Sequence, residues 1–207
     1  MTRNSNRVAS AWPAGMDALI AVMALAADPV ARWMYPDAQR YLAYFGRFIR
    51  AFASKAFSSG TAWCIEANLG SALGLPSGVK PHAEAIAAIV DESVPPHVMP
   101  NVNAMFGEMT AYYPHKQHWH LPTVGIDPLS HRKALGSALL KETLRGCDQE
   151  HTPAYLESSN PANTMFYRRL GFEALGVIRA ASLLQCSRCC EVRADQVWSS
   201  KRARQLR

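Results

Sequence analysis

The sequence lacks a disulfide-type pattern of cysteines. The five cysteines among its 207 residues are Cys64, Cys147, Cys186, Cys189 and Cys190. Their number is odd and their spacing uneven, whereas a disulfide framework uses an even set at regular spacings. We therefore expect free thiols and a reducing compartment.

Long hydrophobic runs are also absent. Runs such as Ala21–Ala27 fall well short of the roughly 20 apolar residues that span a bilayer. No stretch near Met1 has the basic-then-apolar order of a signal peptide. The sequence therefore predicts a cytoplasmic protein with no membrane partner.

Internal repeats, low-complexity tracts and Gly/Ser linkers are missing as well. With 49% hydrophobic and 18% charged residues, the composition excludes disordered, collagen-like and coiled-coil chains. A chain of this length buries most of its apolar surface in a single core. We expect one domain over residues 8–180 and a tail of different composition over residues 181–207.

The net charge of +6 is concentrated in that tail. From Cys186 to the end, six basic and two acidic residues give 6 − 2 = +4, so the rest of the chain is only mildly basic. A nucleic-acid partner would have to be bound by the tail. We favour a solvated, partly disordered tail and expect no such partner.

The first half of the sequence predicts helices around a short hairpin. Apolar residues from Asp17 to Ala27 recur at helical spacing until Asp28-Pro29 ends the pattern. Trp33–Tyr35 is interpreted as a connector. A second, aromatic helix and two later helices follow from the same spacing, and two β-type runs flank a turn. The aromatic helix is marked by Tyr41, Phe45, Phe48 and Phe52, and the two later helices by Ile86–Val90 and Val102–Tyr113. The β-type runs are Thr61–Glu66 and Ser71–Leu75, and the turn between them is Asn68–Gly70.

The second half alternates strands and helices. Strands are predicted over Trp119–Asp127, Ala154–Ser158 and Phe172–Ile178, and a helix over Leu135–Arg145 that closes at Gly146. Asn160-Pro161 starts a further helix, which ends at Gly171. The pattern predicts an α/β fold with a mixed sheet between helices.

One loop in this half has the character of an anion site. The strand that ends at Asp127 is followed by His131, Arg132 and Lys133 and then directly by a helix. Unpaired N–H groups at a helix N-terminus, with basic side chains beside them, can hold a pyrophosphate. The GxxxxGK[ST] and GxGxxG spacings are absent. Taken alone, the loop would be interpreted as a structural turn in which Gly136 merely lets the helix pack closely.

A second motif follows about twenty residues later. Tyr155–Phe172 combines a strand, an Asn-Pro turn and a helix that displays Tyr167 before a Gly-Phe ending. In this order and at this separation the two motifs resemble the GNAT-type acyl-CoA N-acyltransferases, in particular bacterial members similar to puromycin N-acetyltransferase. The resemblance is close over residues 119–176, weaker over 28–37 and 73–79, and lost after about residue 178.

The resemblance implies a mostly antiparallel central sheet in which two parallel strands splay apart to admit acetyl-CoA. Pantetheine would pair with the backbone of the first strand as an added strand does, and backbone N–H groups of the basic loop would hold the diphosphate. The implied cofactor-binding residues are Val124, Gly125, Ile126, Arg132, Lys133, Ala134, Leu135, Gly136, Ser137 and Asn163. By the same likeness, Tyr167 would protonate the departing thiolate.

The loop departs from the family pattern at two positions. His131 stands where Gln or Arg is usual, and Ala134 stands for the first glycine. Because alanine lacks glycine's freedom at positive φ, we expect the loop to form if Ala134 has an ordinary backbone conformation. The alanine side chain also leaves less clearance for a phosphate, and the positive charges of Arg132 and Lys133 partly offset this loss.

Acyl transfer to an amine also needs a base. His118 and His120 share a face of the predicted strand because strand side chains alternate, and histidine has a suitable pKa. We name His120 first, with Glu157 and Glu66 as weaker candidates. The alternative is a histidine bonded to a neighbouring backbone group. A zinc site at His115, His118 and His120 is not favoured, because no fourth ligand is indicated, and we expect no metal.

Structural alternatives remain for the other singled-out residues. Tyr167 would otherwise be a half-buried core aromatic, and Asn163 could cap the turn that begins at Asn160. Trp33–Tyr35 could anchor the core or border an acceptor pocket. A closing strand is expected from the resemblance, and Ala181–Cys186 could supply a poor one.

These observations together predict an N-acetyltransferase that moves an acetyl group from acetyl-CoA to a primary amine of a small molecule by direct attack. The non-catalytic alternative is an acyl-CoA-binding or sensing module. We expect a monomer or homodimer. The acceptor itself cannot be read from the chain, because fold does not fix function.

Overall fold

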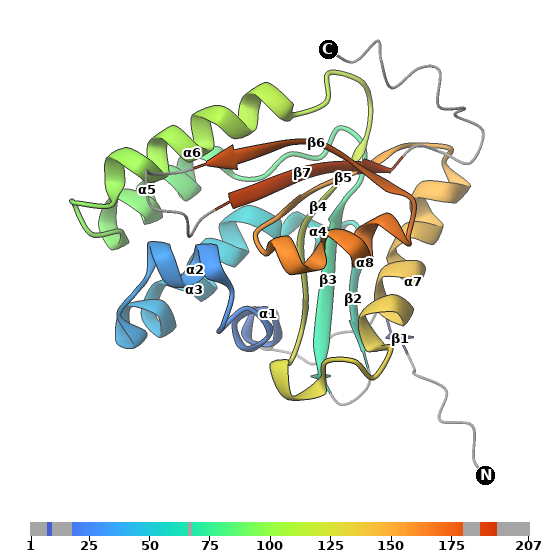
Figure 1. The fold of residues 1–207 in the computed structure, drawn as a ribbon, viewed down its shortest axis with the longest axis horizontal. Coiled ribbons are helices and arrows are strands. Elements are labelled where there is room, and N and C mark those ends of the chain that lie inside the picture. Colours follow the sequence, from blue (N-terminus) through green and yellow to red (C-terminus); the bar gives the residue numbers. More distant parts are fainter. Residues whose placement is uncertain (1–7, 10–17, 66–67, 180–186, 194–207) are drawn as a thin grey trace.

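The computed structural model describes residues 8–9, 18–65, 68–179 and 187–193, and is built around one seven-stranded sheet (Figure 1). The strand order is β1-β2-β3-β4-β5-β7-β6, and all neighbours are antiparallel except β4 and β5. The strands are β1 (Val8–Ala9), β2 (Ala62–Ile65), β3 (Gly70–Leu75), β4 (Trp119–Ile126), β5 (Ala154–Ser158), β6 (Phe172–Arg179) and β7 (Ser187–Arg193). The mixed sheet predicted from the sequence is confirmed.

Helices cover both faces of this sheet. They are α1 (Leu19–Ala24), α2 (Pro29–Met34), α3 (Ala38–Ala53), α4 (Lys55–Ser58), α5 (Ala83–Ser93), α6 (Met99–Tyr112), α7 (Leu135–Gln149) and α8 (Thr164–Arg168). Alternation along β3 separates the faces: Ala72 is buried with Leu135 and Leu139 of α7, while Leu73 and Leu75 are buried with α3. None of the described helices is long and apolar enough to cross a membrane.

Helix α3 confirms the aromatic helix predicted from the sequence. Tyr41, Phe45, Phe48 and Phe52 form a continuous stack, with ring centroids 4.7, 5.9 and 5.5 Å apart. All four are buried. Burying an aromatic side chain contributes about 1.5–3 kcal/mol, so this row fixes α3 against the sheet.

The segment after α1 differs from the prediction. The periodic stretch ends as helix at Ala24, and Trp33 and Met34, expected in a connector, lie in helix α2. Asp28 caps that helix: its Oδ1 accepts hydrogen bonds from the N–H groups of Val30 (3.0 Å) and Ala31 (2.9 Å). Asp28-Pro29 thus starts a new helix, because proline suits the first helical position, and does not itself end α1, which stops at Ala24.

Gly146 does not end helix α7, which continues to Gln149. A Cβ at Gly146 would lie 2.8 Å from the indole of Trp119 in β4. The glycine lets the helix pack on that indole, so it serves close approach rather than termination.

The closing strand lies later in the chain than expected. Strand β7 runs over Ser187–Arg193 and inserts between β5 and β6. The stretch suggested for it, Ala181–Cys186, falls outside the described residues, as do the side chains of Cys189 and Cys190. Part of the tail therefore completes the sheet.

Candidate functional site

The parallel strands β4 and β5 are paired at one end and apart at the other. They pair at Trp119↔Ala154 and His120↔Tyr155, although β4 continues to Ile126 and β5 to Ser158. Beyond His120 the strands diverge, and a pocket opens between them. The splayed arrangement expected from the sequence is confirmed.

A bulge in β4 marks where the divergence starts. Against β3, Thr123 pairs with Leu73 and His120 pairs with Leu75, so Leu121 and Pro122 together oppose Gly74. A bulge bends the strand that carries the extra residue. Pro122 also has no N–H to offer a neighbouring strand. The sequence from 121 to 122 therefore favours a strand that turns away from β5.

The pocket brings the strand that precedes the basic loop together with the second motif. Thr123 and Val124 come from β4, Glu157 and Ser158 from β5, and Asn163 and Tyr167 from the turn and helix that follow. Opposite them lie helical side chains of α2, α3 and α6. This helical wall includes Val30, Ala31, Met34, Phe45, Phe48, Ile49, Phe52, Met105 and Phe106. Trp33 is not among the described lining residues, whereas its neighbour Met34 is.

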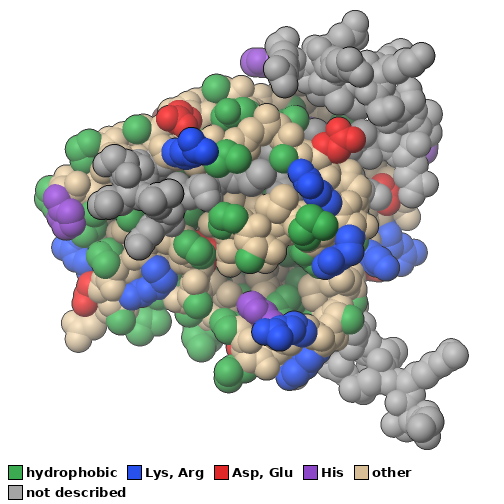
Figure 2. Space-filling view, in the orientation of Figure 1, with side chains coloured by type: hydrophobic (Ala, Val, Ile, Leu, Met, Phe, Trp, Pro, Cys, Tyr) green, Lys and Arg blue, Asp and Glu red, His purple; other side chains and the backbone are tan. Residues whose placement is uncertain are grey.

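The basic loop lies beyond the end of β4, outside this pocket. It precedes helix α7, whose 15 residues give it a substantial dipole, and the first turn of a helix leaves N–H groups without an internal acceptor. Figure 2 shows Lys and Arg side chains gathered with a histidine over this loop. His131, Arg132 and Lys133 are exposed. The loop fits a bound diphosphate in charge and in donor supply.

Ala134 does not have an ordinary backbone conformation. Its φ is +62°, in the left-handed region, and Arg132 has the same φ. That conformation costs an L-residue about 1–2 kcal/mol. The loop thus keeps a glycine-like shape with alanine in place. At Gly136, by contrast, a Cβ would make only ordinary contacts, 3.5 Å from Phe166 and 3.6 Å from Ile126, so close packing does not by itself require that glycine.

The two base candidates from neighbouring strands are hydrogen-bonded to each other. Nε2 of His120 lies 3.0 Å from Oε2 of Glu157, and their side chains are 3% and 2% exposed. Glu157 lines the pocket, while the imidazole of His120 lies beside the rings of Phe52, Tyr113 and Tyr155. The histidine is thus bonded to a carboxylate, not to the backbone group of the alternative interpretation.

His118 and His120 do share a face, because both rings contact Tyr113 and Tyr155. His118 instead bonds a backbone group, with Nδ1 2.7 Å from the carbonyl oxygen of Lys116. Burial lowers the pKa of His118. His115 is exposed, and no group of three His, Cys, Asp or Glu side chains among the described residues is placed to hold a metal. Glu66 lies outside the described residues.

Asn163 and Tyr167 reach the pocket from the two ends of a short helical segment. Asn160, not Asn163, caps the turn: its side chain accepts a 3.0 Å hydrogen bond from the N–H of Ala162. In the described part of the chain Asn163 makes no capping bond, and it is exposed. Tyr167 is 6% exposed and packs on Phe166 and Phe172. The tyrosine is therefore both a core aromatic and a pocket residue.

Sequence reasoning missed Asp28 as a pocket residue. Besides capping α2, its Oδ2 accepts a hydrogen bond from the hydroxyl of Ser159, just beyond β5. Both residues line the pocket. The available signal was Asp before Pro, which indicates a helix cap but not that the cap borders a site.

Solved structures with the same architecture include proteins described as acetyltransferases. A protein from Corynebacterium glutamicum, described as "histone acetyltransferase HPA2 and related acetyltransferase", matches 94% of this chain and 99% of its own, with a TM-score of 0.65 and 20% identity. Drosophila melanogaster polyamine N-acetyltransferase matches over 91% and 99%, with a TM-score of 0.60 and 15% identity. A mosquito arylalkylamine N-acetyltransferase-like protein matches over 91% of this chain and 99% of its own, with a TM-score of 0.55 and 10% identity.

No family model matches the chain. The structural likeness spans nearly the whole chain at low sequence identity, so it establishes the arrangement of the backbone. The parallel strands that part at His120 are the feature that the sequence resemblance led us to expect. The chain has the acyl-CoA N-acyltransferase fold.

Proposed function

We propose that this protein is an N-acetyltransferase that moves an acetyl group from acetyl-CoA to the primary amine of a small molecule by direct attack. The observation that carries the proposal is the pocket between the diverging strands, which has Glu157 on one strand and Tyr167 on the following helix. Two groups that exchange protons on opposite sides of a reacting carbonyl are what this reaction needs.

Acetyl-CoA fits the parts around that pocket. Residues Val124, Gly125 and Ile126 lie in the part of β4 that is not paired with β5, so their backbone groups are placed to pair with the amides of pantetheine. The N–H groups from Lys133 to Ser137 and the charges of Arg132 and Lys133 would hold the diphosphate. Asn163, exposed at the pocket, would bond the pantetheine arm.

Glu157 would accept the proton of the ammonium group. Glu157 lines the pocket, whereas His120 is not among the described lining residues and is hydrogen-bonded to Glu157. This arrangement reverses the order expected from the sequence: Glu157 becomes the first candidate for the base, and His120 becomes the residue that positions it. The neutral amine then attacks the thioester carbonyl, and the C–S bond breaks as the tetrahedral intermediate collapses.

Tyr167 would donate its phenolic proton to the departing thiolate. Its ring is fixed by edge contacts to Phe166 and Phe172, with centroids 5.2 and 5.8 Å away. A buried, fixed hydroxyl protonates a leaving group without a large reorganisation cost. The attached nitrogen then loses its second proton, which restores the phenol of Tyr167, and Glu157 releases the first proton to solvent. The products are an amide, free CoA thiol and one proton.

The acceptor class is supported by the neighbours as well as by the pocket. Proteins with the same fold are described as acting on polyamines and arylalkylamines. We further propose that the protein is cytoplasmic, in keeping with the odd number and uneven spacing of its cysteines. We propose a monomer or a homodimer as its oligomeric state.

The test is product formation from acetyl-CoA and a panel of primary amines, followed by mass spectrometry of the acetylated amine. We expect an acetylated product with at least one amine, and its loss in the double variant Glu157→Gln/Tyr167→Phe. The strained loop at Ala134 favours one rival, a module that binds acyl-CoA without turnover. A thermal shift with CoA but no product from any amine would establish that rival.

A further inference from the structure

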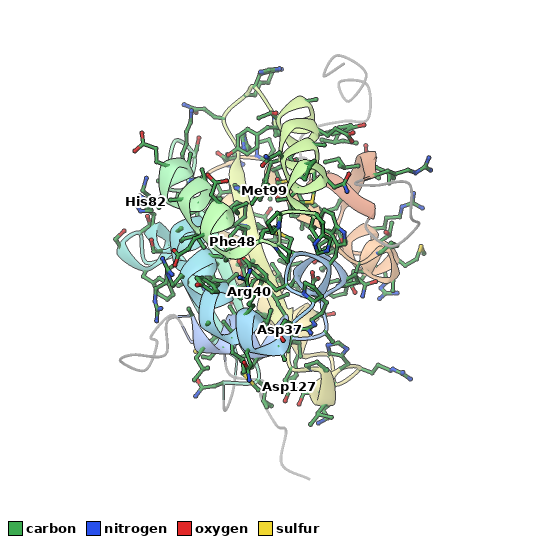
Figure 3. All side chains as sticks on the ribbon, turned by 90° about the vertical axis from the view of Figure 1, so that its left-hand side faces the viewer. Asp37, Arg40, Phe48, His82, Met99 and Asp127 are labelled. Atoms are coloured by element: carbon green, nitrogen blue, oxygen red, sulfur yellow. The ribbon has the colours of Figure 1, made fainter. Side chains whose placement is uncertain are left out.

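The helical side of the pocket is aromatic and apolar. Phe45, Phe48 and Phe52 of α3 and Phe106 of α6, here called the aromatic wall, line it together. The three α3 rings are buried and Phe106 is half-buried. Figure 3 faces the helical layer and shows Phe48 near its centre and Asp127, at the start of the basic loop, near its lower end. The aromatic wall is therefore separate from the loop proposed to hold phosphate.

The charged residue types in the described pocket lining are both acidic. Among the described residues that line the pocket, Asp28 and Glu157 are charged and none is Lys, Arg or His. Three of the basic side chains on the neighbouring helices are engaged elsewhere: Arg32 and Arg40 donate to the backbone oxygens of Pro36 (2.6 Å) and Ser93 (2.7 Å), and Arg47 bonds Glu92 (2.7 Å). A carboxylate or phosphate on the acceptor would thus enter an apolar pocket without a countercharge, which is costly.

The two carboxylates do not offer two equivalent ammonium sites. A carboxylate has about four acceptor positions. Asp28 accepts from two backbone N–H groups and from the Ser159 hydroxyl, so it is committed to the protein. Glu157 is the carboxylate placed opposite Tyr167 in the reaction proposed above. A second cationic group on the acceptor would therefore face aromatic and aliphatic side chains rather than a second carboxylate that could pair with it.

We propose that the acceptor is a primary monoamine with an uncharged aromatic body, whose amino group faces Glu157 and whose ring lies against the aromatic wall. This inference rests on the proposed function and specifies its substrate class. Aromatic rings pack on one another with a preference beyond the area they bury, and a pocket lined by apolar side chains with few polar groups selects by the placement of those groups. An acceptor of this class brings one amine to Glu157 and carries no anion.

Three amines test each feature separately. Phenethylamine has the aromatic ring and one amine, phenylalanine adds a carboxylate to the same skeleton, and putrescine replaces the ring with a second amine. We expect kcat/KM for phenethylamine to exceed that for either of the others by about 10²-fold, the effect of leaving one charge unpaired. A preference for phenylalanine or putrescine would overturn the substrate class while leaving acetyl transfer itself intact. Acetylation of no amine would overturn the proposed function, and this inference with it.

A matched pair of substitutions locates the contact. In Phe106→Leu, which keeps a half-buried side chain apolar, we expect KM for phenethylamine to rise about three- to tenfold, as loss of an aromatic pair predicts, with KM for acetyl-CoA unchanged. Phe57→Leu is the control, because Phe57 is also half-buried but lies outside the described pocket lining, and it should leave both values unchanged. Equal effects in the two variants, or none in Phe106→Leu, would overturn the aromatic contact.

Discussion

His120 and Glu157 form a buried hydrogen-bonded pair at the place where strands β4 and β5 begin to part. His120 is the last residue of β4 that pairs with β5, where its partner is Tyr155, and Glu157 lies two residues after Tyr155. Pairing holds the strands together up to His120, and the bulge at Leu121 and Pro122 then carries β4 away. The same divergence that opens the pocket thus places Glu157 in the pocket lining, hydrogen-bonded to His120.

Glu157→Gln tests the base. Glutamine keeps the size of the side chain and a hydrogen bond to His120 but cannot take a proton. We expect kcat to fall roughly 10²–10⁴-fold, the usual contribution of a general base, with little change in KM for acetyl-CoA. Steady-state kinetics on the best amine of the panel gives the answer, and an unchanged kcat would remove Glu157 from the mechanism.

Tyr167→Phe tests the acid. The ring and its contacts to Phe166 and Phe172 are kept, and only the proton donor is lost, so kcat should fall about 10²-fold while CoA affinity in calorimetry stays the same. Tyr112→Phe is the control, since Tyr112 packs near Gly176, away from the described pocket lining. Similar losses in both variants would contradict a specific role for Tyr167.

Ala134→Gly should stabilise the protein by about 0.5–1 kcal/mol in urea unfolding. Glycine removes the cost of a left-handed φ, which outweighs its greater freedom in the unfolded chain. Ala138→Gly is the matched control within α7, and there glycine should destabilise by about 1 kcal/mol. We also expect Ala134→Gly to bind CoA more tightly. Loss of stability in both variants would show that Ala134 is not strained.

Gly146→Ala and Gly107→Ala should have opposite effects on stability, although both lie inside helices. A Cβ at Gly146 would lie 2.8 Å from the Trp119 ring. A Cβ at Gly107 would meet no atom of the described residues within 4 Å beyond its own stretch of helix. Overpacking costs about 1–3 kcal/mol, while a free helical site gains about 0.5–1 kcal/mol from alanine. Thermal unfolding should show Gly107→Ala above wild type and Gly146→Ala below it. Stabilisation by Gly146→Ala would contradict the packing of α7 on Trp119.

The lowered pKa of His118 predicts a pH dependence of stability. Burial between Tyr113 and Tyr155 disfavours the charged imidazole, and His120 opposes it further, while the Lys116 carbonyl and Glu157 act in the other direction. The unfolded chain then binds more protons than the folded one below the ordinary histidine pKa of 6.5, so the free energy of unfolding falls as pH drops through that value. Above it His118 contributes no further change.

Urea unfolding at mildly acidic and mildly alkaline pH checks this for wild type and His118→Asn. We expect the variant to lose less stability on acidification than the wild type. An identical loss in both proteins would assign the pH dependence to other groups.

Much of the fold could be predicted from local pattern. The hairpin of β2 and β3, strands β4, β5 and β6, and the aromatic helix α3 all follow from alternation or helical spacing over short windows. The helix end predicted at Gly171 is also confirmed: α8 stops just before it, and the glycine has a left-handed φ of +89°. These features depend on neighbours in the sequence, which is why the sequence alone predicts them.

Other features depend on residues far apart in the chain. Gly146 has the pattern of a helix end but is explained by Trp119, 27 residues earlier (146 − 119 = 27), and the tail strand β7 is defined by its pairing with β5 and β6. The relation between His120 and Glu157 needs the parallel register of two strands. Sequence reasoning named both residues as rival bases, and the structure makes them one pair.

A crystal structure of the protein with CoA tests the central claim most directly. We predict pantetheine in the opening between β4 and β5 alongside Val124 to Ile126, the diphosphate on the N–H groups at the start of α7, and the sulfur within hydrogen-bond reach of the Tyr167 hydroxyl. Strands β4 and β5 paired along their whole length, with CoA bound elsewhere and Tyr167 turned away from its sulfur, would contradict the claim.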